Sequence, residues 1–122
     1  MIKIHDGVAI NPINIVSVIC NDDGIAFFFL NGRMHKYMCT NSAIAFTVWC
    51  EKIQRHVPLL HVSEGRAVNI DAIASMAKIA PGIAFNLIGG HTEFVTFEGE
   101  VLKDNAFNGF IAEINKLESE AA

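Results

Sequence analysis

The sequence predicts an α+β fold made of two tandem β-meander-plus-helix repeats, related by a pseudo-two-fold axis, with mainly antiparallel sheet and one helix in each repeat. Three observations predict it. Short apolar runs are separated by turns that contain glycine, a helical pattern closes each half, and the second half repeats the first at an offset of 58 residues. We expect one domain over 1–122, built from repeat 1 (1–56) and repeat 2 (62–119) and joined by a short apolar linker, 57–61.

The repeat is the strongest of these observations, because it needs no gap over 26 positions. Ten pairs are identical: Gly7/Gly65, Ala9/Ala67, Asn11/Asn69, Ile15/Ile73, Ser17/Ser75, Gly24/Gly82, Ile25/Ile83, Ala26/Ala84, Phe27/Phe85 and Gly32/Gly90. Composition bias explains a few apolar matches, but it does not explain three glycine pairs in register. The two halves therefore share one structural module.

Four residue pairs predict tight hairpin turns between short β-rich runs. They are Asp6-Gly7, Asn31-Gly32, Glu64-Gly65 and Gly89-Gly90. A type I′ turn needs positive φ at both central residues, which favours Asp6-Gly7 and Asn31-Gly32, and the other two pairs occupy the same places in the second copy. Between the first turns, Asn11-Pro12 breaks the chain and Ile15 opens a strand. The corresponding segment 71–79 is rich in alanine, so the pattern allows either a strand or a helix there.

The central strand of the first copy, 25–30, is apolar on both faces, which is typical of a strand buried on both sides. Residues on one face agree between the copies: Ile25, Phe27 and Phe29 correspond to Ile83, Phe85 and Leu87. On the other face Asn86 stands where the first copy has Phe28. We therefore expect Phe28 and Asn86 to mark a contact with another repeat or another chain, with Tyr37 and Trp49 as further interface candidates.

A helix is predicted at the end of each copy. The first begins at Asn41 or Ser42, either of which can cap it. The second begins at Asp104 or Asn105, and its apolar residues follow helical spacing: Phe107, Phe110, Ile111, Ile114 and Leu117. An insertion of three residues precedes this helix.

Composition limits the partners. The chain is 52% hydrophobic and 18% charged, with a net charge of −4. So many apolar residues predict self-association into a homodimer or a higher oligomer, and a protein partner is possible. The negative charge argues against nucleic acid. We find no signal peptide and no membrane-spanning run, and three cysteines without metal spacing, so we expect a cytoplasmic protein without cofactor or metal.

Catalytic motifs are absent from the sequence. No H-E-x-x-H segment, nucleophile elbow or phosphate-binding loop occurs, and Cys50 beside Trp49 fits a buried, inert thiol. A stacking platform for single strands would need basic neighbours, and near the aromatic run only Arg33 and Lys36 qualify. We assign no catalytic, cofactor-binding or metal-binding residue, and we expect a protein that is not an enzyme.

A family resemblance rests on the first copy, where Ile10-Asn11-Pro12 and Ile15 precede the strand that ends in Asn31-Gly32. The strand-strand-helix end of this pattern is similar to LytTR-type DNA-binding domains and to small bacterial or phage proteins of unassigned role. The resemblance implies DNA binding. The basic positions that contact DNA in a LytTR module are not evident, so no functional residue carries over.

Three hypotheses for function follow. Our first expectation is a non-enzymatic binding, adaptor or regulatory protein that acts as a homo-oligomer, because no chemical motif is present. The first alternative is a nucleic-acid-binding regulator with a LytTR-like module. The second alternative is a small-molecule binder or an enzyme with a site between the repeats, since a duplicated module can build a site at its axis.

Overall fold

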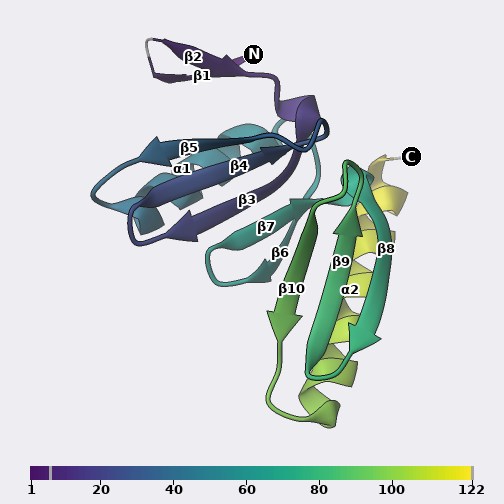
Figure 1. Cartoon of the computed structure of the whole chain (residues 1–122). Coiled ribbons are helices and arrows are strands. Elements are labelled where there is room, and N and C mark those ends of the chain that lie inside the picture. Colours follow the sequence, from purple (N-terminus) through teal and green to yellow (C-terminus); the bar gives the residue numbers. More distant parts are fainter. Residues whose placement is uncertain (6, 122) are drawn as a thin grey trace.

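The computed structural model describes residues 1–5 and 7–121 and is α+β, with antiparallel strand pairs and two α-helices (Figure 1). The α+β prediction is therefore confirmed. In chain order the elements are β1 (Ile2–His5), β2 (Val8–Ile10), the 3-10 helix η1 (Pro12–Asn14), β3 (Ile15–Asn21), β4 (Gly24–Phe29), β5 (Met34–Met38), α1 (Ser42–Gln54), β6 (Leu59–Ser63), β7 (Arg66–Asn69), η2 (Ile70–Ala72), β8 (Ile73–Ile79), β9 (Gly82–Leu87), β10 (Thr92–Thr96) and α2 (Glu100–Ala121).

Three sheets organise these strands. A two-stranded sheet holds β1 and β2, a five-stranded sheet has the order β5-β4-β3-β7-β6, and a three-stranded sheet has the order β10-β9-β8. Each half of the chain runs through the same series of elements, but the pairing differs. The hairpin β6–β7 comes from the second half and joins the first half's sheet through β3. It begins at Leu59, inside the segment that we expected to be a linker.

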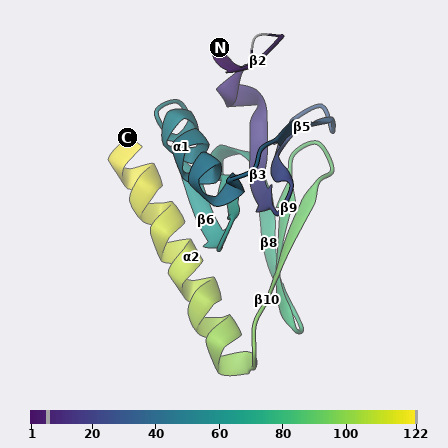
Figure 2. The same ribbon diagram turned by 90° about the vertical axis from the view of Figure 1, so that its left-hand side faces the viewer.

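Two apolar cores lie under the two helices. The first collects Ile25 and Phe27 of β4 with Trp49 and Ile53 of α1, and the second collects Ile83 and Phe85 of β9 with side chains of α2. Figure 2 shows α1 and α2 on the same side of the molecule. Both central phenylalanines, Phe27 and Phe85, are fully buried. The repeated face of the central strand therefore packs against the helix of its own half.

Close approach of the backbone explains one glycine pair of the repeat. A Cβ atom on Gly24 would lie 2.0 Å from the carbonyl oxygen of Tyr37, and one on Gly82 would lie 2.0 Å from that of Val95. Both glycines open the central strand where the next strand ends beside it. No other residue type fits at either position without moving a strand.

At three places the local structure decides or changes what the sequence predicts. The segment 71–79 is resolved in favour of a strand, because η2 ends at Ala72 and β8 follows. Helix α2 begins at Glu100, earlier than Asp104, because Gly99 adopts a positive φ and the expected insertion forms the first helical turn. Residue 41 precedes α1, yet its side chain makes no capping hydrogen bond.

The type I′ turn was wrong for the pair that follows β4. Among the described residues only glycines have positive φ, so Asn31 does not adopt it while Gly32 does, at 82°. The connection is longer than two residues, and the amide of Gly32 donates to the carbonyl oxygen of Phe29 at 2.9 Å. The Asp6-Gly7 turn falls partly outside the described residues. Neither helix of the described chain is long and apolar enough to cross a membrane.

Candidate functional site

The two hairpin turns that follow the central strands meet in space. A Cβ atom on Gly89 would lie 2.3 Å from the carbonyl oxygen of Leu30, and one on Gly32 would lie 3.4 Å from that of Gly89. Beside this contact the ring of Phe28 stacks on His91, with centroids 4.0 Å apart. The turns therefore form a joint between the five-stranded and the three-stranded sheet.

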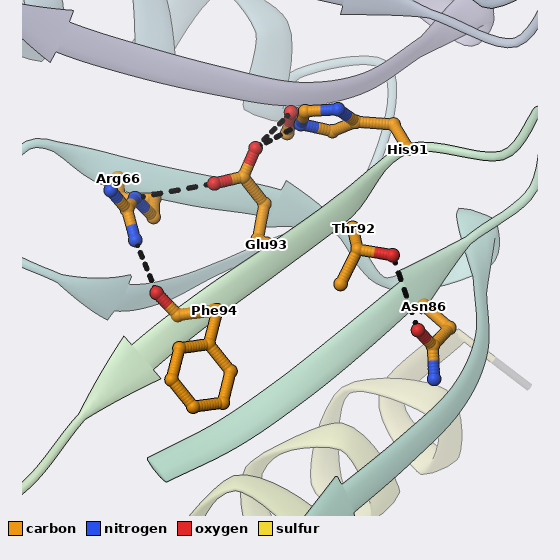
Figure 3. A network of polar contacts seen from close by, with 7 residues as sticks. Arg66, Asn86, His91, Thr92, Glu93 and Phe94 are labelled. Carbon is orange, nitrogen blue, oxygen red and sulfur yellow. Dashed lines mark hydrogen bonds and ion pairs between the residues drawn. The ribbon is translucent and has the colours of Figure 1, made fainter. Parts of the chain in front are cut away.

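A buried carboxylate lies next to this joint. Glu93 of β10 is 3% exposed, and its carboxylate contacts Arg66 Nε at 3.2 Å and the ring of His91 (Figure 3). The hydroxyl of Ser17 in β3 donates to the same carboxylate at 3.2 Å. A buried carboxylate is tolerated only with such partners. The cluster ties β10 to β3 and β7.

The same cluster does not form a catalytic relay. In a nucleophile triad the imidazole accepts the hydroxyl proton and the acid orients the imidazole. Here the hydroxyl of Ser17 and the imidazole of His91 both contact one carboxylate oxygen of Glu93, and Ser17 is fully buried. The arrangement holds two sheets together and presents no accessible nucleophile. Among the described residues no group of three His, Cys, Asp or Glu could hold a metal ion.

Arg66 makes a second contact with β10 in addition to its ion pair with Glu93. Its Nη1 donates to the carbonyl oxygen of Phe94 at 2.7 Å, so one guanidinium contacts both a buried carboxylate and the backbone (Figure 3). Sequence reasoning missed this cluster. The signal was available, because Glu93 and Val95 share the buried face of β10, and a charged residue at an inward position of a strand needs partners.

The four residues singled out from the sequence do not come together. Trp49 is buried and packs edge-on against Phe27 and Tyr37, with centroids 5.9 and 6.1 Å away. Phe28, on the other face of β4, packs against the second core. Asn86 lies in β9, where its amide donates to Ser75 at 3.0 Å and accepts from Thr92 at 3.2 Å.

Two cations lie in β5, the outer strand of the five-stranded sheet, and in the turn that precedes it. Arg33 belongs to the turn that meets Gly89, and Lys36 lies in β5, which is at the edge of the sheet. Both residues are exposed. Lys36 contacts Asp23 at 3.8 Å, and the two side chains are 38% and 70% exposed, so this ion pair contributes little to stability. The backbone amide of Arg33 donates a hydrogen bond to the side chain of Asn31 and is therefore already satisfied within the turn.

Comparison with known proteins provides one likeness. No protein-family model matches the sequence, and no curated protein matches it. Among solved structures, the chain is similar to a LytTr DNA-binding domain from Bacillus cereus, with a TM-score of 0.60 and 9% sequence identity. The match covers 90% of this chain and 93% of that chain. At this identity the likeness shows the fold.

The likeness contradicts two expectations from the sequence. A non-enzymatic adaptor was our first hypothesis, and nucleic acid was considered an unlikely partner; a fold shared with a DNA-binding domain favours the alternative instead. The first error came from treating the absence of a motif as evidence. The second came from the net charge of −4, which does not report how charge is distributed over a surface.

Proposed function

We propose that this protein is a regulator that binds duplex DNA. The observation that carries the proposal is the likeness to a LytTr DNA-binding domain, which extends over 90% of this chain and 93% of that chain. The strand-strand-helix pattern in the sequence supports the same function.

Arg33 and Lys36 are the residues that we assign to the DNA backbone. Both are exposed cations on one strand and its preceding turn. Each phosphate neutralised by such a side chain releases condensed counterions, so affinity falls as salt rises, with a slope near −0.9 for each contact. Two contacts predict a shallow dependence of about −2 on a double-logarithmic plot.

The experiment is a selection from a pool of randomised duplexes with the full chain, followed by affinity measurement on the enriched sequence. We expect one sequence to be enriched over successive rounds and to bind more tightly than a scrambled duplex. A pool that stays random at low salt would contradict the proposal. The double variant Arg33→Ala with Lys36→Ala should bind all sequences more weakly and flatten the salt dependence, whereas Lys116→Ala, an exposed cation on α2, should not.

The two halves of the chain, residues 1–56 and 62–119, are in our proposal copies of one module related by a pseudo-two-fold axis. The identical series of elements and the paired glycines Gly24 and Gly82 support this relationship. An experimental structure tests it directly. Halves that superpose by a rotation close to a half-turn agree with the proposal, and a rotation far from it does not.

The interface role of Phe28, Tyr37, Trp49 and Asn86 likewise stays a proposal. Of these, Asn86 is best suited to test it, because its side chain lies near the surface and is held by two hydroxyls. Asn86→Ala should weaken DNA binding or self-association while the protein remains folded. Unchanged affinity and unchanged oligomeric state would remove Asn86 from any interface.

A further inference from the structure

One strand pair joins the two halves within the chain. Strand β7 lies antiparallel to β3, with the register Ser17–Val68, Val18–Ala67 and Ile19–Arg66. The side-chain amide of Asn69 adds a bond to the carbonyl oxygen of Ile15, at 2.8 Å. The hairpin β6–β7 therefore completes the sheet of the first half and covers its edge.

The second half has no such hairpin in this chain. Its sheet has the order β10-β9-β8, so among the described strands β8 is left at the edge. Residues of β8 are therefore less buried than the corresponding residues of β3. Val16 and Ser17 of β3 are fully buried, whereas their counterparts Ala74 and Ser75 in β8 are exposed. A seven-residue strand with an open edge is a template for pairing with another strand.

The helix above this edge differs in the same way. Cys50 of α1 is 3% exposed, because the hairpin β6–β7 and the first core cover it, while Ile111 of α2 stands at the corresponding place and is 38% exposed. The second half thus presents both an open strand edge and an apolar helix residue where the first half is closed.

The complementary element is the hairpin β1–β2. It corresponds to β6–β7. Ile10 of this hairpin is buried in the first core, but other positions are exposed where those of the copy are buried. Leu59 is 3% exposed and its counterpart Met1 is 80% exposed. Ala67 is fully buried, and its counterpart Ala9 is exposed. Figures 1 and 2 show this hairpin at the far end of the molecule from β8 of the same chain. It cannot complete its own second sheet without large movement.

We infer that β2 of one chain pairs antiparallel with β8 of a second copy. The register follows from the pair β3–β7 by the repeat offset: Ile10 opposite Ser75, Ala9 opposite Met76 and Val8 opposite Ala77. The sheet of the second half then gains the two strands that the first half already has. Main-chain hydrogen bonds supply the affinity in this kind of strand addition.

One side chain supports the register. Asn69 accepts from the amide of Asp71 and donates across the strand pair to Ile15. Asn11 accepts from the amide of Ile13 in the same way. In the assembly the amide of Asn11 would donate to the carbonyl oxygen of Ile73 in the second copy. The same asparagine, at the same place in each half, thus has the same role.

The contact is heterologous, because a hairpin of one chain meets the strand edge of another. Such contacts close into rings, or into a dimer with two reciprocal contacts, or they continue as filaments. The copies differ at several positions of the joint, and at one of them Asn31 stands where Gly89 packs closely on Leu30. The turn of Asn31 cannot approach the second copy so closely, so the joint between chains is more open there than the joint within a chain. This assembly does not depend on DNA binding.

Sedimentation velocity of the full chain over a range of concentrations tests the assembly. We expect the wild-type protein to form concentration-dependent oligomers. Ala9→Arg should weaken association by roughly tenfold or more, because it buries an unpaired charge against β8, while the exposed position leaves the single chain folded. Ile44→Arg, at a residue of α1 that is 63% exposed and outside the proposed contact, should leave association unchanged.

Disulfide trapping tests the register independently. Chains with Ala9→Cys are mixed with chains with Met76→Cys under oxidation, and we expect a covalent dimer that neither variant nor the wild-type chain forms alone. Mass spectrometry should locate the bond between the two introduced thiols. A wild-type protein that is monomeric throughout, association that Ala9→Arg does not weaken, or a bond that forms only within chains carrying both substitutions would overturn the inference.

Discussion

The ring of Phe28 in the first half of the chain stacks on the imidazole of His91 in the second half, with an interplanar angle of 12°. The pair lies beside the joint where the two hairpin turns touch. Phe28 also packs against the second core, although its strand belongs to the first sheet. Phe28 therefore acts together with the cluster around Glu93 to hold the two sheets in one orientation.

Replacement of Phe28 by alanine should destabilise the protein by about 2 kcal/mol, since the ring is only partly buried and loses both the stack and its apolar contacts. Urea unfolding followed by circular dichroism measures the change. Phe94→Ala is the matched control, because Phe94 is 38% exposed and should cost less than half as much. Equal losses for the two variants would mean that the stack contributes nothing specific.

Glu93→Gln should also lower stability, by about 2 kcal/mol. The amide keeps one oxygen for Ser17, but it removes the negative charge that faces Arg66 and the His91 ring. Chemical denaturation at neutral pH reports the loss. Glu98→Gln changes the same charge at an exposed position and should have almost no effect. If both variants are equally stable, the buried cluster is not what joins the sheets.

Two glycine substitutions should act in opposite directions. Gly82→Ala places a Cβ atom against the carbonyl oxygen of Val95, so β9 and β10 must separate and stability should fall by more than about 2 kcal/mol. Gly109→Ala lies within α2, where nothing approaches within 4 Å, and should raise stability by about 0.5–1 kcal/mol. Thermal melts of the two variants side by side decide this, and a stable Gly82→Ala protein would count against the strand geometry.

Cys50 should be chemically inert in the folded protein. Burial, with a smaller contribution from the Cys20 thiol, raises the pKa of Cys50 from 9.0 to about 12. The folded chain therefore retains a proton that the unfolded chain releases above pH 9, so this contribution to stability is present below pH 9 and is lost as pH rises towards 12.

Two measurements check this. Alkylation near pH 8 should modify Cys20 and Cys39, which are partly exposed, and should reach Cys50 only after unfolding. Stability of the wild type should also fall more steeply between pH 9 and 12 than that of Cys50→Ala. Rapid labelling of Cys50 in the folded state would show that the thiol is accessible.

Much of the fold could be predicted from local signals. The alternation of apolar runs and turns predicted the strands, and the repeat allowed 71–79 to be a strand despite its alanines. The start of α2 could not be predicted, because no strong capping residue precedes Glu100 and a glycine with positive φ sets the boundary. The pairing of β7 with β3 was also beyond reach, since the pattern of a strand does not name its neighbour.

The candidate site was less predictable than the fold. The strand pattern indicates that Glu93 faces inward and needs partners, but it does not name them, and Ser17 lies 76 positions away in the sequence. Trp49 and Tyr37 were interface candidates because they are large aromatic residues, but their rings pack against each other in the first core. The net charge led us to expect that nucleic acid is an unlikely partner. A net charge sums over the whole surface, so it does not report a local group of cations.

The most direct test of the account is a fluorescence anisotropy titration of the full chain with the duplex obtained by selection, at about 50 mM salt where backbone contacts are strongest. We predict saturable binding that is tighter for the selected duplex than for its scrambled version and weaker for Arg33→Ala with Lys36→Ala. An anisotropy that does not change over the whole titration, or equal binding to both duplexes by wild type and variant, would contradict a role as a DNA-binding regulator.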